Sequence, residues 1–334
     1  MTSSAQHPLV IAHRGASGYR PEHSRSAYEL AIDLGADAIE PDIVPSKDGV
    51  LVLRHENEIS GTTDVADRPE FAARRVTKIV DGIEVTGWFT EDFTWAELAT
   101  LTLRERLPAM RPNNTTFDGL EGMLRLSDLV QILDAAPRPV GLVAEIKHAA
   151  YFDSIGLPLA ELFAAEMVAL GWAADPRLTI ESFELDVLHS IRAAGIEAPL
   201  IYLIEAQGAP ADRVARDGDA ASPYSQDLSD AGLAALVASG IDGISVSKKL
   251  LLRVGEDGAP AITSVVQRAH GVGLRVFTWT LRAENIFLVK GFRSGVSPEH
   301  FGDWLAEFQL IMSSGVDGVF ADQPDLAALA RLRR

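Results

Sequence analysis

Short apolar runs alternate with amphipathic stretches eight times along the chain, and this alternation limits the possible folds more than any other feature. The apolar runs predict strands at 9–12, 38–43, 140–146, 178–183, 199–205, 243–247, 275–280 and 317–321. The amphipathic stretches predict helices at 24–34, 127–136, 157–171, 184–194, 229–239, 262–270, 302–313 and 324–332. Runs such as PLIYLIE are apolar throughout, which is typical of strands buried on both faces of a parallel sheet. Eight such units predict an α/β fold, the (β/α)8 TIM barrel.

Three of the predicted joints between a helix and the next strand share one pattern. They read LGADAIE (34–40), SGIDGIS (239–245) and SGVDGVF (314–320). A glycine just past a helix supplies the left-handed residue that ends it, and the apolar pair that follows opens a strand. The shared joint supports one repeated α/β unit. The main rival, a doubly wound open sheet of the Rossmann type, is weakened because no GxGxxG pattern follows the first strand.

Residues 56–126 interrupt the alternation after the second strand. Just before them, a predicted turn at 47–49 leads into a short strand at 50–54. The long segment itself is polar, shows no pattern of a buried strand, and contains aromatic residues that we interpret as exposed: Trp88, Phe89, Phe93 and Trp95. We expect a single barrel domain over 1–334, in which 56–126 is an insertion. It is either a lid over the mouth of the barrel or a surface elaboration without a catalytic role.

The charge balance limits the partners of the chain. It carries 47 acidic and 30 basic residues, a formal net charge of −17. This opposes nucleic-acid binding, because such binding requires Lys and Arg to neutralise phosphates. Any anion site must therefore be local. The chain has no cysteine, which excludes disulfides and thiolate chemistry.

No apolar stretch approaches the ~20 residues that cross a bilayer, so we expect no integral membrane segment. The first residues, MTSSAQHPLV, have neither the basic region nor the apolar core of a signal peptide. We therefore expect a cytoplasmic protein, or a periplasmic or secreted one if a leader has been removed.

Charged residues stand at the ends of several predicted strands, where the active residues of such barrels gather. Glu40 and Asp42 are two residues apart, so their side chains point to the same face of the second strand. Glu145 ends the third strand beside them. Three convergent carboxylates repel one another and favour a hard divalent cation, Ca²⁺ or Mg²⁺. The alternative is that each carboxylate pairs with a basic residue, and Lys147 is placed to do this for one of them.

Two histidines, His13 and His55, end segments on either side of this carboxylate cluster. Such a pair suits proton transfer, because imidazole titrates near neutral pH. Arg14 and Lys147 add positive charge beside the cation site, an arrangement suited to an anionic phosphoryl group. The pattern therefore predicts phosphoryl chemistry at the mouth of the barrel.

Four separated motifs resemble, in this order, the glycerophosphodiester phosphodiesterase family: HRGASGYRPEHS, EPDIVPSKDGVLVLRHE, AEIK and VFTWT. The resemblance runs from Ile11 to Asp325 and includes that family's insertion between the second strand and the second helix. It implies a (β/α)8 barrel that uses a divalent cation to hydrolyse a small glycerophosphodiester to glycerol phosphate and an alcohol. One departure is His23, where many members have Asn; we expect it to be structural or a neighbour of the capping residue Ser24.

The resemblance also implies roles for the residues at the strand ends. These are the acid–base pair His13 and His55, the metal ligands Glu40, Asp42 and Glu145, the phosphate clamp Arg14 and Lys147, and the apolar walls of the glycerol site, Phe183 and Trp279. It leaves open which histidine is the acid. It also leaves open whether water or the neighbouring glycerol hydroxyl attacks phosphorus.

Two acidic residues are expected to support this site from behind. Glu22 either braces Arg14 or His13, or is a carboxylate at the positive N-terminus of the following helix. Glu56 follows the second histidine, where many members of the family have Asp. If that carboxylate orients His55, the extra methylene of Glu shifts the geometry and leaves room for altered activity.

Three alternative functions remain open from the sequence. The first is a barrel phosphodiesterase or lyase that acts on lysophospholipid, sphingolipid or inositol lipid, which the aromatic residues of 56–126 would favour by forming an apolar rim. The second is a glycosidase with Glu40 and Glu145 as paired carboxylates. Aromatic residues, at 7%, are few for binding sugars, and such an enzyme has little use for Arg14 and Lys147. The third is a protein that binds phosphodiesters without turnover.

Overall fold

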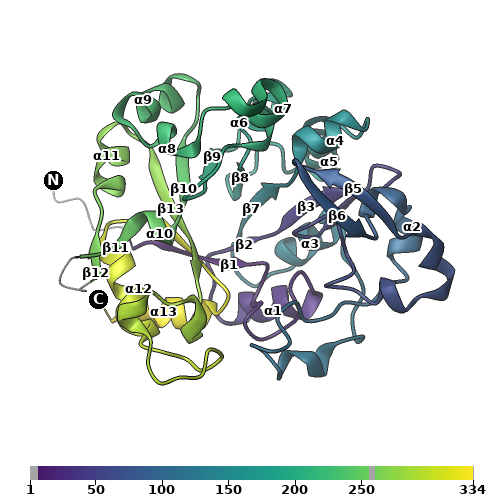
Figure 1. Ribbon diagram of the computed structural model, residues 1–334, viewed down its shortest axis with the longest axis horizontal. Helices are drawn as coiled ribbons and strands as arrows, with labels where there is room; N and C mark the ends of the chain where they lie inside the picture. Colours follow the sequence, from purple (N-terminus) through teal and green to yellow (C-terminus); the bar gives the residue numbers. More distant parts are fainter. Residues whose placement is uncertain (1–6, 256–259, 334) are drawn as a thin grey trace.

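The computed structural model describes residues 7–255 and 260–333, which form a closed parallel barrel surrounded by helices (Figure 1). The barrel strands are β1 (Leu9–His13), β2 (Ala38–Glu40), β3 (Asp42–Pro45), β7 (Gly141–Ile146), β8 (Leu178–Ser182), β9 (Leu200–Ile204), β10 (Gly243–Ser247), β13 (Arg275–Leu281) and β14 (Gly318–Ala321). The ring closes because β1 pairs with both β14 and β2, and β2 and β3 both pair with β7. The predicted (β/α)8 barrel is confirmed.

The second barrel position is shared by two short strands, where the sequence predicts one strand over 38–43. The break falls at Pro41, which has no amide hydrogen to donate to a ladder. Its carbonyl still accepts from the backbone N–H of Glu145 at 3.0 Å. Beyond the break, β3 also pairs antiparallel with β4 (Leu51–Leu53), the short strand predicted at 50–54.

The three repeated joints have the same backbone conformation and make the same hydrogen bond to a neighbouring strand. Their glycines, at positions 35, 240 and 315, all have positive φ, between 86° and 92°. In each joint the aspartate two residues later accepts a backbone N–H from the neighbouring strand at 2.7–2.8 Å. The pairs are Asp37 with Val10, Asp242 with Leu200 and Asp317 with Val276. The repeated pattern thus marks the amino ends of three barrel strands.

All eight predicted helices are present around the barrel. They are α1 (Arg25–Asp33), α3 (Leu126–Asp134), α5 (Leu159–Ala169), α6 (Leu185–Ala193), α9 (Asp230–Ala238), α11 (Val265–Gly271), α12 (Trp304–Ser313) and α13 (Pro324–Leu332). The start of α11 was predicted three residues too early, because Ile262 belongs to β12 (Pro260–Ile262), which pairs antiparallel with β11 (Leu252–Val254). Among the described residues, no helix is both long and apolar enough to cross a membrane.

Several short elements were not predicted from the sequence. They are α4 (Ala149–Ser154), α7 (Ala211–Asp217), α8 (Tyr224–Asp227), α10 (Lys248–Leu251) and the hairpin of β11 and β12. Each is too short to show a clear period of apolar residues. All of them follow the carboxyl end of a barrel strand or extend the connection that does, so they add to the same end of the barrel.

The segment 56–126 contains α2 (Trp95–Leu98) and a hairpin of β5 (Val76–Val80) and β6 (Ile83–Gly87), on one flank of the barrel (Figure 1). The prediction that Trp88, Phe89, Phe93 and Trp95 are exposed is wrong. Phe89 and Phe93 are fully buried, Trp88 is 9% exposed, and Trp95 is half-buried against the core. Trp88 and Phe93 belong to the same apolar core as the barrel, and Phe93 meets Phe71 edge-to-face at 5.0 Å between ring centroids. The polarity of the surrounding sequence concealed this burial.

The interior of the barrel has an apolar layer of its own. Six strands each contribute one buried residue to it: Ile11, Ala38, Val143, Ile201, Phe277 and Phe320. The residues on either side of each in sequence face outward toward the helices, as the period of two in a strand requires. The layer closes the barrel beneath the charged residues at the strand ends.

We expect Phe277→Ala to destabilise the protein by about 3–5 kcal/mol, because it opens a cavity inside this layer where Phe277 packs against Phe320. Urea denaturation followed by circular dichroism measures the loss. The matched control is Ile79→Ala on the hairpin, since Ile79 is 67% exposed and its truncation leaves no cavity. Equal midpoints for the two variants would contradict this description of the barrel interior.

Candidate active site

The carboxyl ends of the barrel strands bring three acidic side chains together. Glu40 ends β2, Asp42 begins β3, and Glu145 lies next to the end of β7. Asp42 and Glu145 are register partners in adjacent parallel strands. One oxygen from each of the three carboxylates lies within 4.8 Å of the other two, and all three residues are buried. The break at Pro41 therefore does not separate the side chains on either side of it.

This cluster has the donor set of a site for a hard divalent cation, since all its ligand atoms are carboxylate oxygens. Glu40 Oε1 and Asp42 Oδ1 are buried without a hydrogen-bond partner among residues 7–255 and 260–333. Burial and repulsion from Asp42 raise the pKa of Glu40 well above its usual range. Burial also raises the pKa of Glu145 to about 7, against the opposing charge of Lys147. A cation bound here would compensate both effects.

Two basic side chains contact the same cluster. Arg14 Nε lies 2.9 Å from Asp42 Oδ2, and Lys147 Nζ lies 2.7 Å from Glu145 Oε1. Pairing with basic residues, the alternative considered from the sequence, is thus present for two of the three carboxylates. Within the part of the chain that the structure describes, Glu40 has only the backbone N–H of Arg14, which donates to its Oε2 at 2.8 Å. Three carboxylates against two cations leave negative charge in the cluster.

One histidine of the site is held by a carboxylate from the far end of the chain. His13 ends β1, and its Nδ1 lies 2.7 Å from Oδ1 of Asp322, which directly follows β14. The other oxygen of Asp322 accepts from Arg111 at 2.6 Å and from Arg282 at 2.7 Å. Burial and the charge of Arg14 lower the pKa of His13 to about 4. The contact at Nδ1 leaves Nε2 to face a substrate.

The second histidine has the same kind of partner. His55 Nδ1 lies 2.5 Å from Oε1 of Glu56, so the extra methylene of Glu does not prevent the contact. Burial, Arg14 and Lys147 together lower the pKa of His55 below its usual value. Both imidazoles therefore have one ring nitrogen fixed by a carboxylate and the other available to the cavity.

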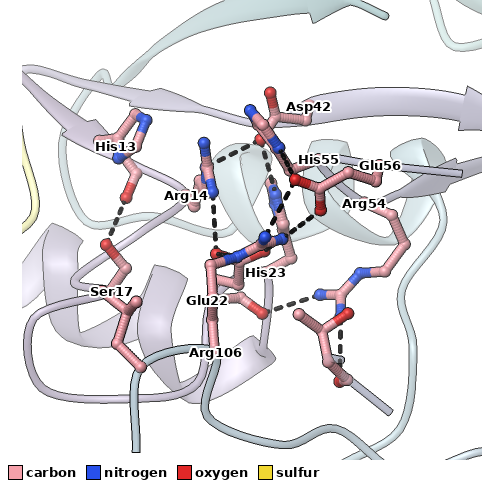
Figure 2. A network of polar contacts seen from close by, with 12 residues as sticks. His13, Arg14, Ser17, Glu22, His23, Asp42, Arg54, His55, Glu56 and Arg106 are labelled. Atoms are coloured by element: carbon pink, nitrogen blue, oxygen red, sulfur yellow. Dashed lines mark hydrogen bonds and ion pairs between the residues drawn. The ribbon is translucent and has the colours of Figure 1, made fainter. Parts of the chain in front are cut away.

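An arginine from the segment 56–126 links the residues behind this site (Figure 2). Glu22 Oε2 accepts from Arg14 Nη1 at 2.9 Å, and no contact with His13 is present among the described residues. Arg106 donates to both oxygens of Glu22, at 2.6 and 2.7 Å, and to Oε2 of Glu56 at 2.6 Å. Burial alone would raise the pKa of Glu22, but Arg106 and Arg14 hold it well below its usual range.

The apolar part of the site consists of two rings from strands that are separated by β9 and β10 in the barrel. Phe183, just after β8, meets Trp279 of β13 edge-to-face at 5.6 Å between centroids. Lys147 Nζ lies 5.3 Å from the centroid of Phe183, and Trp279 donates its indole N–H to the backbone oxygen of Ser245 at 3.2 Å. The aromatic wall therefore adjoins the charged cluster directly.

A cavity of about 1100 Å³ joins these groups. Of the residues expected at the site from the sequence, the cavity is lined by His13, Arg14, Glu40, His55, Glu145, Lys147, Phe183 and Trp279. Asp42 lies behind them, in contact with Arg14. Cavities lined by titratable groups with shifted pKa values, at this end of a barrel, are typical of active sites.

One carboxylate at the cluster was missed in the sequence. Glu181 of β8 is a fourth buried carboxylate and the register partner of Glu145. Burial and the charges of Glu145 and Asp42 raise its pKa well above the usual range. The sequence signal for this residue is a glutamate inside the apolar run LTIES of a predicted strand. His23 was expected to be structural, but its Nε2 also lies 3.0 Å from Asp42 Oδ2, while Nδ1 contacts Tyr28.

Fold and site together are those of a barrel enzyme with a charged cavity at the carboxyl ends of its strands. The model of the Glycerophosphoryl diester phosphodiesterase family matches residues 13–326. The chain therefore belongs to this family.

Relatives and solved structures agree with the family. Glycerophosphodiester phosphodiesterase GDPD6 of Arabidopsis thaliana is 33% identical over 94% of this chain and 83% of its own length. A glycerophosphodiester phosphodiesterase of Haemophilus influenzae is 25% identical, over 95% of this chain and 88% of its own length. The chain spans only 40% of another Arabidopsis relative, GDPDL6, at 28% identity.

Among solved structures, a phosphodiesterase of Oleispira antarctica has a TM-score of 0.63 at 21% identity, over 97% of this chain and 96% of that one. A glycerophosphodiester phosphodiesterase of Parabacteroides distasonis has a TM-score of 0.60 at 18% identity, over 99% of both chains. At these identities the likeness supports the fold.

We expect Asp322→Asn to destabilise the protein by about 3–5 kcal/mol, because it removes the charge that two buried or half-buried arginines share. The midpoint of urea denaturation measures the change. Glu29→Gln is the control, since Glu29 makes an exposed pair with Arg25 on α1 and such pairs contribute about 0–1 kcal/mol. A loss for Asp322→Asn no larger than for the control would show that the buried network carries little stability.

Proposed function

We propose that the chain hydrolyses glycerophosphodiesters to glycerol phosphate and an alcohol, with His13 and His55 as the acid–base pair. The observation that carries this proposal is the content of one cavity. It combines a cluster of three carboxylates, two cationic side chains, and two imidazoles that are each fixed through Nδ1 by a carboxylate. Family membership supports the substrate class, since the relatives are glycerophosphodiester phosphodiesterases.

The carboxylate cluster of Glu40, Asp42 and Glu145 would hold one divalent cation, Ca²⁺ or Mg²⁺. When bound, the cation supplies Lewis acidity at a non-bridging phosphate oxygen. Arg14 and Lys147, which already contact this cluster, bind the other non-bridging oxygen of the phosphodiester. Their charges are fixed before substrate arrives, so they need little reorganisation as charge develops.

The two histidines divide the proton transfers between them. One imidazole accepts at its Nε2 the proton of the nucleophile, which is either water or the neighbouring glycerol hydroxyl, and the other donates a proton to the departing alcohol from its own Nε2. Glu56 and Asp322 each hold an Nδ1, which fixes the tautomer and the ring orientation. The edge-to-face rings of Phe183 and Trp279 provide an apolar surface for the glycerol carbons.

A similar solved structure gives further support for glycerol phosphate as a product. The Oleispira antarctica phosphodiesterase is described as a complex with the product sn-glycerol-3-phosphate. We infer that the present cavity accepts the same glycerol phosphate group. The cavity volume of about 1100 Å³ leaves room for an alcohol beyond it.

In its described residues, the structure does not provide the apolar rim on which the alternative function, action on a lipid substrate, was based. Of the four aromatic residues that suggested an apolar rim, Trp88, Phe89 and Phe93 are buried, and Trp95 is half-buried against the core. Soluble glycerophosphodiesters are therefore the first substrates to test. Comparison of lysophosphatidylcholine with glycerophosphocholine distinguishes the two classes.

We expect release of glycerol phosphate from glycerophosphocholine and glycerophosphoethanolamine to stop in EDTA and to return with Ca²⁺ or Mg²⁺. The physical reason is that the buried carboxylates need a cation to bind an anionic substrate. An enzyme-coupled assay for glycerol phosphate measures turnover. The same cation should raise the melting temperature of the wild type and not of Asp42→Asn, a readout that needs no activity. Full activity in EDTA would contradict the role of the cluster.

We expect His13→Ala and His55→Ala each to lower kcat by roughly 10²–10⁴, the usual scale for a lost general acid or base. Steady-state kinetics on glycerophosphocholine measure the loss. His270→Ala is a matched control, since His270 is exposed and pairs with Asp317 at the opposite end of the barrel. Turnover at the wild-type rate in either of the first two variants would remove that histidine from the mechanism.

A further inference from the structure

Two arginines of the segment 56–126 reach back to the two histidine–carboxylate pairs. Arg106 and Arg111 are five residues apart in one loop. Arg106 contacts Glu56, the partner of His55, and Arg111 contacts Asp322, the partner of His13. Each imidazole therefore contacts a carboxylate, and each of these carboxylates contacts a guanidinium group from the same loop.

The contact behind His55 is shared with the phosphate clamp. Arg106 bridges Glu56 and Glu22 through four donor contacts of 2.6–3.0 Å. Glu22 in turn holds Arg14 (Figure 2). The planar fork of Arg fixes the direction of both carboxylates at once, which the single point charge of Lys does not do. Without Arg106, Glu56 is a half-exposed side chain free to change rotamer.

The contact behind His13 is more deeply buried. Arg111, with a side chain 6% exposed, donates to Asp322 at 2.6 Å and to Glu284 at 2.7 Å. It also donates to the backbone oxygen of Ser17 at 3.0 Å, and the hydroxyl of Ser17 donates to the backbone oxygen of His13 at 2.8 Å. The loop thus holds both the ring partner and the backbone of this histidine.

The loop itself is tied to the rest of the segment at its base. Isolated bridges join Thr63 with Leu103 and Thr102 with Gly122. Asn114 adds a contact from the loop to the backbone oxygen of Ser17 at 3.2 Å. The two arginines therefore have fixed positions relative to the barrel.

We propose that Arg106 and Arg111 are positioning residues that fix the imidazoles of His55 and His13 through Glu56 and Asp322. The segment 56–126 then completes the acid–base machinery, which is a different role from a lid or a surface elaboration. This inference rests on the proposed function, because it assigns the two histidines to proton transfer. It adds residues from outside the barrel strands to that site.

The test uses Arg106→Lys and Arg111→Lys in the full-length protein, because Lys keeps the buried positive charge and loses the fork. Arg104→Lys is the matched control, since Arg104 lies in the same loop and pairs with the exposed Asp67. We expect kcat on glycerophosphocholine to fall by about 10–100-fold in the first two variants with little change in KM, because small misplacements of a catalytic group reduce the rate on this scale. The control should keep the wild-type kcat.

A double-mutant cycle tests the route through the carboxylates. In a Glu56→Gln background, Arg106→Lys should reduce kcat much less than it does in the wild type, and Asp322→Asn should do the same for Arg111→Lys. A rise in KM with unchanged kcat would mean that the arginine binds substrate directly, and would overturn the positioning role. So would equal losses in both backgrounds.

Histidine-ring NMR provides a readout that does not depend on turnover. With the signals assigned from His13→Gln and His55→Gln, Arg106→Lys should shift only the ring of His55, and Arg111→Lys only that of His13. Unchanged ring signals in both variants would overturn the inference. If the wild type hydrolyses no glycerophosphodiester while these shifts occur, the proposed function fails and the positioning contacts stand.

Discussion

Buried negative charge at the mouth of the barrel is the constraint on which the rest of the site depends. It belongs to four carboxylates on three neighbouring barrel positions: Glu40, Asp42, Glu145 and Glu181. An uncompensated buried ion costs several kcal/mol, so each must meet positive charge or lose its own by protonation. Arg14 and Lys147 compensate part of it. The remaining charge makes the cluster a suitable place for a divalent cation, beside the two cationic side chains that would bind phosphate in the proposed function.

Charges of opposite sign alternate outward from this cluster. Arg14 contacts Asp42 on its inner side and Glu22 on its outer side, and Glu22 contacts Arg106. The path through His13 has the same order, from imidazole to Asp322 to a guanidinium. In a medium of low dielectric constant, an unpaired charge in such a chain raises the free energy of the folded state, whereas a paired charge is firmly held. Firmly held groups are what acid–base chemistry and phosphate binding require.

The sequence predicted the barrel well because its signals are local. Apolar runs, glycine joints and the charges at strand ends can each be read within a few residues, and the register of a parallel barrel then brings Glu40, Asp42 and Glu145 together. The carboxylate partners of the two histidines differ in the same way, because only one of them has a local signal in the sequence. Glu56 adjoins His55 in the sequence and was considered, whereas Asp322 is 309 residues from His13 and has no local signal. The aromatic residues of the segment 56–126 were misread for a related reason, since the core into which they pack is assembled from residues dispersed along the chain.

The position of Arg106 and Arg111 in one loop couples the two halves of the site. A shift of the loop moves both guanidinium groups, and with them the carboxylates that orient the two imidazoles. The base of the loop is held by backbone bridges at Leu103 and Thr102, which lie outside the cavity. In the proposed function, changes there would act on both histidines at once. A segment that looks peripheral in the sequence would therefore set the geometry of proton transfer, while the barrel strands set the geometry of the carboxylate cluster.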